Sequence, residues 1–259
     1  MPRFGSSPAA GGKLLWKGEK KVKNFVTDDA RNGILCLTFD DSRSADWLAA
    51  REIFRQYNAR ATFFYAWELT AEHLEAMKLL QAEGHSIGLH TLHHKDCLFT
   101  EQADLEQYCR EEILPQLEIL QQAGIRVQNF AYPNNRHTAE SDLYLAQYFR
   151  HGRACVTPRP EPARGYWIAG CDACFFDYEK AKDSWALSGP GIGDFYTTTH
   201  ENLEAALVRA AKENKLLLFF SHGIHENAQS IHMKTETLRF CLEKASALGM
   251  KIAGMDELP

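Results

Sequence analysis

The chain has 259 residues, of which 45% are hydrophobic and 24% are charged, and its formal net charge is -5. This composition is typical of a soluble globular protein and argues against a disordered or fibrous chain. Because no long run of Lys and Arg exists to neutralise phosphates, it also argues against nucleic acid or an anionic membrane as the main partner. The length suits one large α/β domain.

The first residues carry no apolar run long enough for the core of a signal peptide, and no stretch of the chain is apolar enough to span a membrane. The seven cysteines are scattered and odd in number, which is more typical of reduced thiols than of a disulfide framework. We therefore expect a cytoplasmic protein. Residues 1–29, which include the basic cluster 17–23, are expected to form an N-terminal extension to a single domain over 30–259.

Short apolar segments alternate with helical patterns along the chain. Strands are expected at 33–41, 61–67, 85–91, 127–133, 153–157, 216–224 and 251–255, with a further possible strand at 165–171. Helices are expected at 44–58, 70–84, 100–124, 138–152, 200–214 and 235–249, the third of them kinked at Pro115. Residues 158–199 break this rhythm and are expected to form an irregular excursion within the same domain. The alternation predicts a parallel sheet covered by helices, either closed into a barrel or doubly wound.

Polar and metal-competent residues follow four of the expected strands. Asp40 and Asp41 end the first strand, the sequence HTLHH (90–94) follows the third, YPNN (132–135) the fourth and SHGIHE (221–226) the penultimate one. Loops that follow the strands of a parallel α/β fold gather at one edge of the sheet. The four segments therefore predict a functional site at that edge.

The spacing of these residues is compatible with a metal site. His90 and His94 are four apart, so in a helical turn both imidazoles would face one cation, while His93 would point elsewhere. Taken alone, such a pair is more often a polar loop, and Asp41 alone is more often a helix cap. Together they form a two-His, one-carboxylate set that leaves positions open on a catalytic divalent metal. That cation would also offset the cost of placing Asp40 beside Asp41.

TFDD (38–41) followed by HTLHH (90–94) resembles the first two motifs of the polysaccharide deacetylases, the NodB-homology group of carbohydrate esterases. The resemblance covers about residues 30–256 in strand order and implies a single-domain, distorted (β/α)7-type barrel. It implies that Asp40 is the catalytic base and that a divalent metal, expected to be zinc, is held by Asp41, His90 and His94. It assigns the catalytic acid to His222, at the end of the apolar strand LLLFFSHGI.

The third family motif, usually R-x-P-Y, reads AYPN here (131–134). Ala131 therefore stands where the arginine would be, and Asn134 stands where the tyrosine would be. The resemblance still assigns oxyanion or substrate contacts to Tyr132, Pro133 and Asn134, since the backbone N–H of Asn134 can hold a developing oxyanion whatever its side chain.

Two roles in the resemblance lack a clear match. Arg136, Arg153 or another side chain would replace the arginine that orients the base, unless Asp40 is held more loosely. The fourth family motif, an Asp-Trp element that orients the catalytic histidine, has candidates in CDAC (171–174), FDY and KDSW, of which Asp172 is preferred. His225, three residues after the expected acid, is read as a loop residue or a wall of the pocket.

These assignments predict a metal-dependent hydrolase that removes N-acetyl or O-acetyl groups from a carbohydrate and releases acetate. Two alternatives remain open. A small-molecule amidohydrolase of the same family, acting on a ureide or cyclic amide, would suit a cytoplasmic location. A catalytically silent carbohydrate-binding domain would suit the missing arginine, although the retained Asp40 and His222 argue against it. Sugar rings could stack on some of the aromatic side chains near the strand ends: Tyr65, Trp67, Tyr132, Trp167 and Trp185. The sequence leaves the oligomeric state open.

Overall fold

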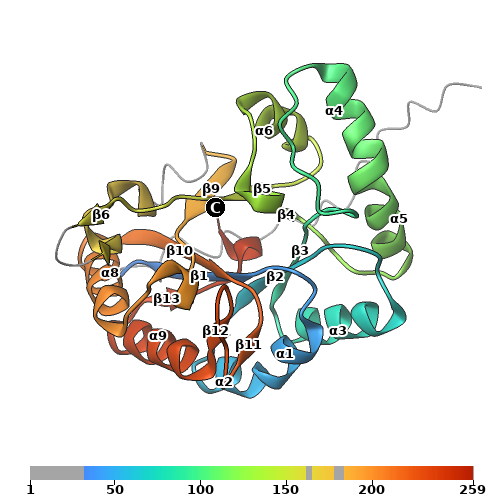
Figure 1. The fold of residues 1–259 in the computed structure, drawn as a ribbon. Helices are drawn as coiled ribbons and strands as arrows, with labels where there is room; N and C mark the ends of the chain where they lie inside the picture. The colour runs from blue at the N-terminus through green and yellow to red at the C-terminus, as the bar shows by residue number, and fades with distance from the viewer. Residues whose placement is uncertain (1–31, 162–164, 178–183, 259) are drawn as a thin grey trace, which may run out of the picture.

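The structure is a computed structural model that describes residues 32–161, 165–177 and 184–258 (Figure 1). The expected N-terminal extension, residues 1–29, lies outside the described residues. The described residues form an α/β unit in which helices surround a curled sheet (Figure 1). The strands of this sheet are β1 (Ile34–Phe39), β2 (Ala61–Tyr65), β3 (Ser86–Leu89), β4 (Asn129–Ala131), β5 (His151–Cys155), β8 (Phe175–Asp177), β9 (Ala186–Gly189), β10 (Lys215–Ser221) and β13 (Lys251–Ile252).

Seven of these strands form a parallel array in the order β10-β1-β2-β3-β4-β5-β9. The far edge of β10 is divided between two neighbours. Its first half pairs antiparallel with β8, and beyond that Phe220 forms a parallel bridge with Gly191, just after β9. The array therefore curls back on itself, and the predicted distorted (β/α)7-type barrel is confirmed.

The helices are α1 (Ser44–Ala49), α2 (Arg51–Gln56), α3 (Ala71–Ala82), α4 (Gln102–Tyr108), α5 (Leu114–Gln122), α6 (Ala139–Leu145), α8 (His200–Lys212) and α9 (Thr235–Ala247). Side chains cap several of them: Thr70, Thr138 and Thr199 each accept a hydrogen bond from the backbone N–H three residues on. The expected kink near Pro115 takes the form of a π-helical turn, Cys109–Ile113, between α4 and α5. No helix in the described ranges combines the length and apolar character needed to cross a bilayer.

Some expected boundaries are wrong. The expected helix 44–58 is divided at Ala50 into α1 and α2, and the expected helix 138–152 ends at Leu145 because the chain must reach β5. The possible strand 165–171 is reduced to β7 (Gly165–Tyr166), which pairs with β6 (Pro160–Glu161) and precedes a 3-10 turn. The excursion 158–199 contributes β8 and β9 to the main sheet. Both strands are short, so their periodicity could not reveal them.

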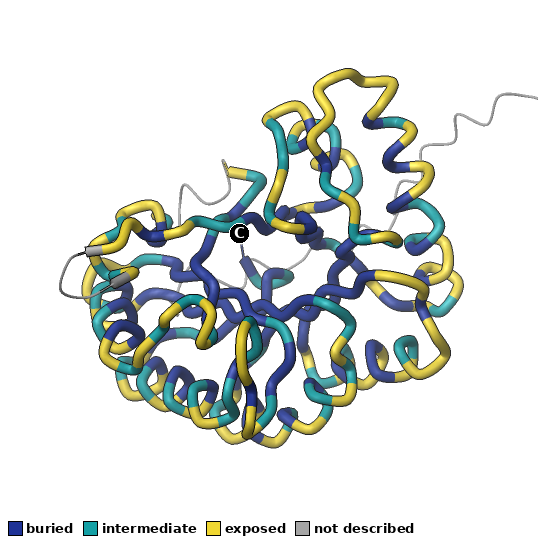
Figure 2. Tube along the Cα trace, viewed as in Figure 1, coloured by how far each residue is buried: buried dark blue, intermediate teal, exposed yellow. Residues whose placement is uncertain are grey.

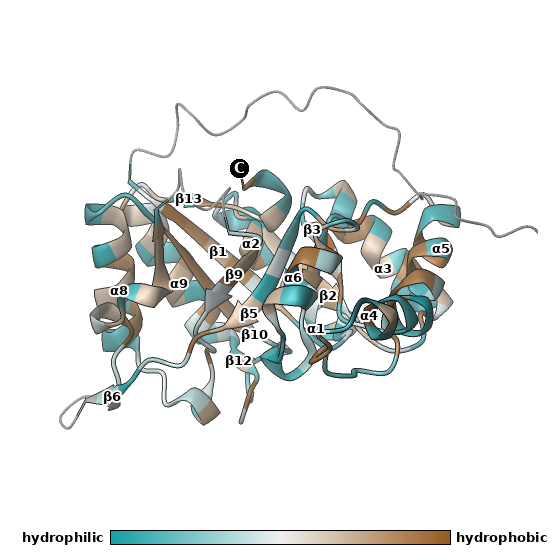
Figure 3. Ribbon diagram, turned by 90° about the horizontal axis from the view of Figure 1, so that it is seen from above, coloured by the Kyte–Doolittle hydropathy of each residue, from teal (hydrophilic) through white to brown (hydrophobic). Residues whose placement is uncertain are grey.

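Alternate residues of β1 enter two separate apolar clusters, as the two faces of a strand require. Leu35, Leu37 and Phe39 belong to the large core shared with the surrounding helices, whereas Ile34 and Cys36 belong to a smaller inner cluster. Figure 2 shows the buried strands in dark blue at the centre of the fold, and Figure 3 shows brown, apolar strands between helices of mixed colour. The inner cluster does not extend to the carboxyl ends of the strands, where polar side chains lie instead.

Candidate active site

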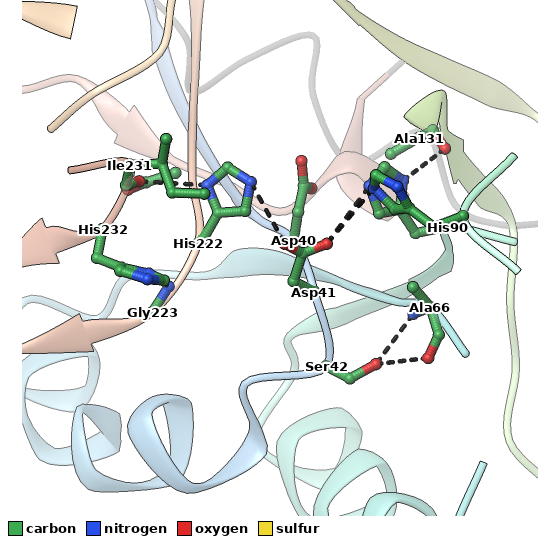
Figure 4. Close-up of polar contacts among 12 residues, drawn as sticks. Asp40, Asp41, Ser42, Ala66, His90, Ala131, His222, Gly223, Ile231 and His232 are labelled. Atoms are coloured by element: carbon green, nitrogen blue, oxygen red, sulfur yellow. Dashed lines mark hydrogen bonds and ion pairs between the residues drawn. The ribbon is translucent and has the colours of Figure 1, made fainter. Parts of the chain in front are cut away.

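Side chains from three strand ends converge as the sequence predicts (Figure 4). Asp41 follows β1, and its Oδ1 atom lies 3.8 Å from His90 Nε2 and 3.7 Å from His94 Nε2, both in the loop after β3. The possible ligand atoms of these three residues, which we call the ligand group, all lie within 4.8 Å of one another. Such spacings suit donors that each lie about 2 Å from one shared ion.

The donor chemistry also fits a divalent metal. Asp41 Oδ1 is buried and accepts no hydrogen bond from the described residues. A buried carboxylate oxygen without a partner is costly, and a cation between it and the two imidazoles would remove that cost. The group combines one carboxylate with two imidazoles, which suits zinc and related transition metals.

Burial and one hydrogen bond leave one ring nitrogen of His90 free to bind a metal. Its Nδ1 lies 2.8 Å from the carbonyl oxygen of Ala131, at the end of β4 (Figure 4). Because a carbonyl only accepts, Nδ1 carries the proton and the lone pair of Nε2 faces Asp41. Burial lowers the pKa of His90 to about 4, despite the opposing effect of Asp40. The ring is therefore neutral at pH 7, as metal ligation requires.

The loop that carries His94 is not the helical turn expected from its spacing. Residues 90–94 have no helical assignment, and Thr91 and His94 adopt left-handed backbone angles, with φ of 69° and 54°. His94 nevertheless faces Asp41, because these angles bend the chain back toward β1. His93 points away from the ligand group, as expected, and its Nδ1 lies 2.9 Å from Glu112 Oε1.

Glu112 fixes this loop from the π-helical turn. Its side chain is fully buried, and its Oε2 accepts a hydrogen bond from the His93 backbone N–H at 2.7 Å. Its own carbonyl accepts from Leu92 N, and its Oε1 lies 3.1 Å from Lys95 Nζ. Sequence reasoning missed Glu112, because an acid within an expected helix is usually a solvated residue. Its position in the π-helical turn is the feature that identifies it, because such a turn changes the direction in which side chains point and is frequent at functional sites.

The turn after β1 supports a ligand role for Asp41 rather than capping. Helix α1 has Arg43 at its N-cap and no side-chain cap. Asp41 and Ser42 have φ of 76° and 52°, so the chain reverses sharply. Ser42 Oγ donates to Ala66 O and accepts from Ala66 N, which holds the turn against the loop after β2 (Figure 4).

The preceding residue, Asp40, is buried and paired with Arg153 of β5. The fully buried Arg153 guanidinium donates to Asp40 Oδ2, while Asp40 Oδ1 has no hydrogen-bond partner among the described residues. Burial alone would raise the pKa of Asp40, but Arg153 and the two nearby imidazoles hold it below its ordinary value. Of the two arginines named as replacements for the family arginine, Arg153 is the one that contacts Asp40. Arg136 is exposed and pairs with Asp96 instead.

His222 approaches the ligand group from the end of β10. Its Nε2 lies 3.7 Å from Asp41 Oδ2, and its Nδ1 lies 3.2 Å from the carbonyl oxygen of Ile231 (Figure 4). That carbonyl fixes the proton on Nδ1. The backbone N–H of Gly223 donates to His232 Nδ1 at 2.9 Å, which steadies the turn beyond His222.

Asp172 does not lie beside His222, and His225 lies in a short strand rather than in a loop. Asp172 belongs to a 3-10 turn, its side chain is 92% exposed, and it pairs with Arg209 on α8, so it does not orient His222. A backbone carbonyl does so instead. His225 lies in the short strand β11 (Ile224–His225), paired with β12 (Met233–Lys234), and its ring lies 5.7 Å from that of His232.

In the segment Tyr132–Asn134, which was expected to contact the substrate or the oxyanion, the Tyr132 side chain is not available to a ligand. The Tyr132 side chain is fully buried and donates to Asp142 on α6, so its ring is not offered to a ligand. Pro133 is also buried. Asn134 is exposed, with a left-handed φ of 51°, and its side chain donates to Asp96.

Trp67 is the exposed aromatic side chain next to the ligand group. Its ring stacks on His94, with centroids 5.7 Å apart and 23° between the planes, and 42% of the residue is exposed. Its backbone has φ of 59°, and it is held by Thr91 O and by the side-chain amide of the buried Gln116. By contrast, Tyr65 is fully buried.

Comparison with known proteins gives one family match. Residues 27–149 match the family model described as polysaccharide deacetylase. A peptidoglycan-N-acetylglucosamine deacetylase from Bacillus cereus is 32% identical over 84 residues, which cover 31% of this chain and 39% of that protein. The match thus spans well under half of that relative's length.

Solved structures share the fold. The chitin deacetylase of Colletotrichum lindemuthianum has a TM-score of 0.57 at 18% identity, over 88% of this chain and 87% of that one. A carbohydrate esterase family 4 pseudoenzyme from Bacillus anthracis has a TM-score of 0.55 at 14% identity, over 88% of this chain and 65% of that one. At these identities the likeness concerns the fold.

Proposed function

We propose that this chain, whose residues 27–149 match the polysaccharide deacetylase family model, is a metal-dependent deacetylase that hydrolyses N-acetyl or O-acetyl groups of a carbohydrate and releases acetate. The single observation that carries the proposal is the group Asp41, His90 and His94 beside the buried pair of Asp40 and Arg153. We propose zinc as the metal and residues 30–259 as one catalytic domain. The names of two similar proteins, which mention N-acetylglucosamine and chitin, favour an N-acetylated glycan.

A divalent metal held by Asp41, His90 and His94 would supply Lewis-acid activation of water at neutral pH. Asp40 is the proposed base, since its ionised carboxylate has one oxygen without a partner to accept the proton. Arg153 holds the other oxygen and so orients the carboxylate.

His222 is the proposed acid. Its Nδ1 is engaged by the Ile231 carbonyl, so Nε2 is the atom that donates a proton to the departing amine. The backbone N–H of Asn134 is proposed to hold the developing oxyanion.

Zinc content and acetate release, measured on the same preparations, test these roles. Asp40→Asn and His222→Ala should retain zinc but lose acetate release from an acetylated chito-oligosaccharide. The double variant His90→Ala, His94→Ala should lose zinc itself. His200→Ala is the matched control, because His200 stacks on Phe240 of α9 at 4.1 Å and should leave both readouts unchanged. Zinc retained at full occupancy by the double variant would contradict the assignment.

The two alternatives are separated by the same preparations. A catalytically silent domain was suggested by Ala131, but Arg153 supplies the missing guanidinium to Asp40, which favours an active site. A small-molecule amidohydrolase, suited to the predicted cytoplasmic location, would release ammonia or a ring-opened product from ureides. Acetate from the glycan together with no product from ureides would support deacetylation.

A further inference from the structure

Two cysteines, Cys171 and Cys174, belong to one tight turn that leads into β8. The 3-10 turn η4 (Asp172–Cys174) has Cys171 at its N-cap, and the backbone N–H of Cys174 donates to the carbonyl oxygen of Cys171 at 3.0 Å. A turn closed by such a bond holds its first and last Cα atoms within about 7 Å of each other. Disulfide bonds span Cα separations of about 4.4–6.8 Å. The backbone therefore holds the two cysteines at a separation that a disulfide can bridge.

The two side chains are also in contact. Both cysteines are reduced in the structure, and the Cys171 thiol forms a hydrogen bond with the Cys174 thiol. The strand considered for 165–171 would have kept the chain extended up to this point, whereas the turn folds it back on itself. The contact between the thiols thus depends on a turn that the sequence pattern did not predict.

The two cysteines differ in their access to solvent. Cys171 is partly exposed, whereas Cys174 is fully buried in the main core. Burial raises the pKa of Cys174, and the neighbouring Cys171 thiol adds to this effect. A dissolved oxidant can therefore reach Cys171, while Cys174 can react only with a sulfur atom that already lies beside it.

Arg209 of α8 holds the turn that carries the pair. Its Nη1 donates to the carbonyl oxygen of Ala169 at 2.9 Å, and its Nη2 donates to Asp172 Oδ1 at 2.6 Å. Its guanidinium carbon lies 4.3 Å from the centre of the Phe175 ring. These contacts fall before, between and after the two cysteines. The positive charge also favours the Cys174 thiolate, so Arg209 both fixes the turn and partly offsets the effect of burial.

We propose that Cys171 and Cys174 form a reversible disulfide and are a redox-modification site outside the ligand group. The stabilisation that a disulfide gives by restricting the unfolded chain is smallest for short loops. A bridge across this single turn would therefore add less stability than one across a long loop, and its role is chemical rather than structural. The inference goes beyond the proposed function and does not depend on it.

The oxidant is a small-molecule disulfide, such as oxidised glutathione. Cys171 loses its proton, and its thiolate attacks one sulfur of the oxidant, forming a mixed disulfide and releasing one glutathione thiolate. Cys174 then loses its proton and attacks the Cys171 sulfur, which forms the protein disulfide and releases the second glutathione thiolate. The two glutathione thiolates take up the two protons. Two protein thiols are thus oxidised, and one glutathione disulfide is reduced.

Mass spectrometry tests the proposal. The chain is incubated with oxidised glutathione under native conditions, the remaining thiols are alkylated, and the protein is cleaved with trypsin. Residues 165–180 then form one peptide, whose only cysteines are Cys171 and Cys174. In the wild type this peptide should lose two hydrogen atoms and resist alkylation. Dithiothreitol should reverse both changes.

Three variants separate the steps, and circular dichroism checks that each is folded. Cys174→Ala, which keeps a small apolar side chain at the buried position, should stop at the mixed disulfide and carry one glutathione on Cys171. Cys171→Ser should leave Cys174 unmodified. Cys155→Ser is the matched control, because Cys155 is also partly exposed and its thiol affects the pKa of Cys174. This variant should form the disulfide as the wild type does.

Complete alkylation of both cysteines in the treated wild type would overturn the proposal. A disulfide that joins Cys155 to Cys174 would also overturn it, as would a bridge that forms only in urea. None of these measurements requires hydrolysis of a substrate, so their outcome is separate from that of the proposed function.

Discussion

Arg153 lies directly opposite Ala131 in the pairing of β5 with β4, and its guanidinium reaches the Asp40 carboxylate. Paired positions on neighbouring strands project to the same face of a sheet. An arginine on β5 can therefore occupy the space that a side chain at position 131 would enter. The chain keeps a cation beside its proposed base, although the motif on β4 lacks one.

Replacement of Arg153 should damage both stability and activity. Arg153→Met leaves the Asp40 charge buried without a partner, which should lower the free energy of unfolding by roughly 3–5 kcal/mol and abolish acetate release. Urea denaturation and an acetate assay measure the two effects. Arg136→Ala is the control, since that exposed pair with Asp96 should contribute less than about 1 kcal/mol.

A second variant separates position from charge. If the register argument holds, Ala131→Arg combined with Arg153→Ala should recover part of the activity lost in Arg153→Ala alone. Wild-type activity in Arg153→Met would refute the orienting role.

Removal of the Glu112 carboxylate should weaken metal binding without touching a ligand. Glu112→Ala leaves the backbone N–H of His93 unpaired, so we expect a loss of zinc affinity of roughly 10–100-fold and a loss of stability of roughly 1–3 kcal/mol. Glu112→Gln keeps an acceptor for that N–H and should lose much less. Competition with a chelator measures the affinity. Glu111→Ala is the matched control, as Glu111 is half exposed; an equal loss there would exclude a specific effect of Glu112.

The backbone of Trp67 allows a test of strain beside the metal group. Because φ is 59° at this position, glycine should be more favourable there than alanine. At positions with negative φ, alanine is usually the more stabilising of these two residues. Trp67→Gly should therefore be more stable than Trp67→Ala, by roughly 1 kcal/mol in urea denaturation. The opposite order would show that the left-handed angle is not retained in these variants.

His85 should make the fold sensitive to mild acid. It is buried between Phe54 and Phe63, its Nδ1 accepts from the Ala61 backbone N–H, and burial lowers its pKa to about 4. In the unfolded chain its pKa is near 6.5, so the unfolded state binds the extra proton between pH 6.5 and 4. Its stabilising effect is complete above pH 6.5 and falls by up to about 3 kcal/mol toward pH 4.

The variant His85→Asn keeps an acceptor but cannot titrate. It should be less stable than the wild type at pH 7, because ring packing is lost, yet it should lose less stability between pH 7 and pH 4. Denaturation curves at both pH values measure the difference. Burial also lowers the pKa of His151, but both proteins contain this residue, so its effect cancels in the comparison. Identical pH slopes would contradict the assignment.

The strand ends that carry Asp40, Asp41, His90, His94 and His222 could be predicted because apolar strands and their terminal polar residues are local in sequence. Parallel strand order brings the loops that carry Asp41, His90 and His94 to the same edge of the sheet. The prediction that a helical turn brings the His90 and His94 rings together was wrong. Residues with left-handed backbone angles do so instead.

The supporting groups could not be predicted because they depend on register and on backbone atoms. Arg153 is placed by the pairing of β4 with β5, and Glu112 by a π-helical turn. The group that orients His222 is the carbonyl of Ile231, which no side-chain motif encodes. Strand β9 was missed because it is only 4 residues long.

At the end of the barrel opposite these groups, the chain crosses beneath the strands. Met255 donates its backbone N–H to Thr62 Oγ1 and Asp256 donates to Ser86 Oγ, both near strand beginnings, while Met255 and Leu258 fill the inner apolar cluster. Met255 and Leu258, both buried, therefore fill this end of the described barrel, whereas His94 and His222 are partly exposed at the other end. Under the proposed function, acetate released beside these histidines leaves from the face at which the next sugar arrives, so added acetate should slow turnover by competing with the substrate.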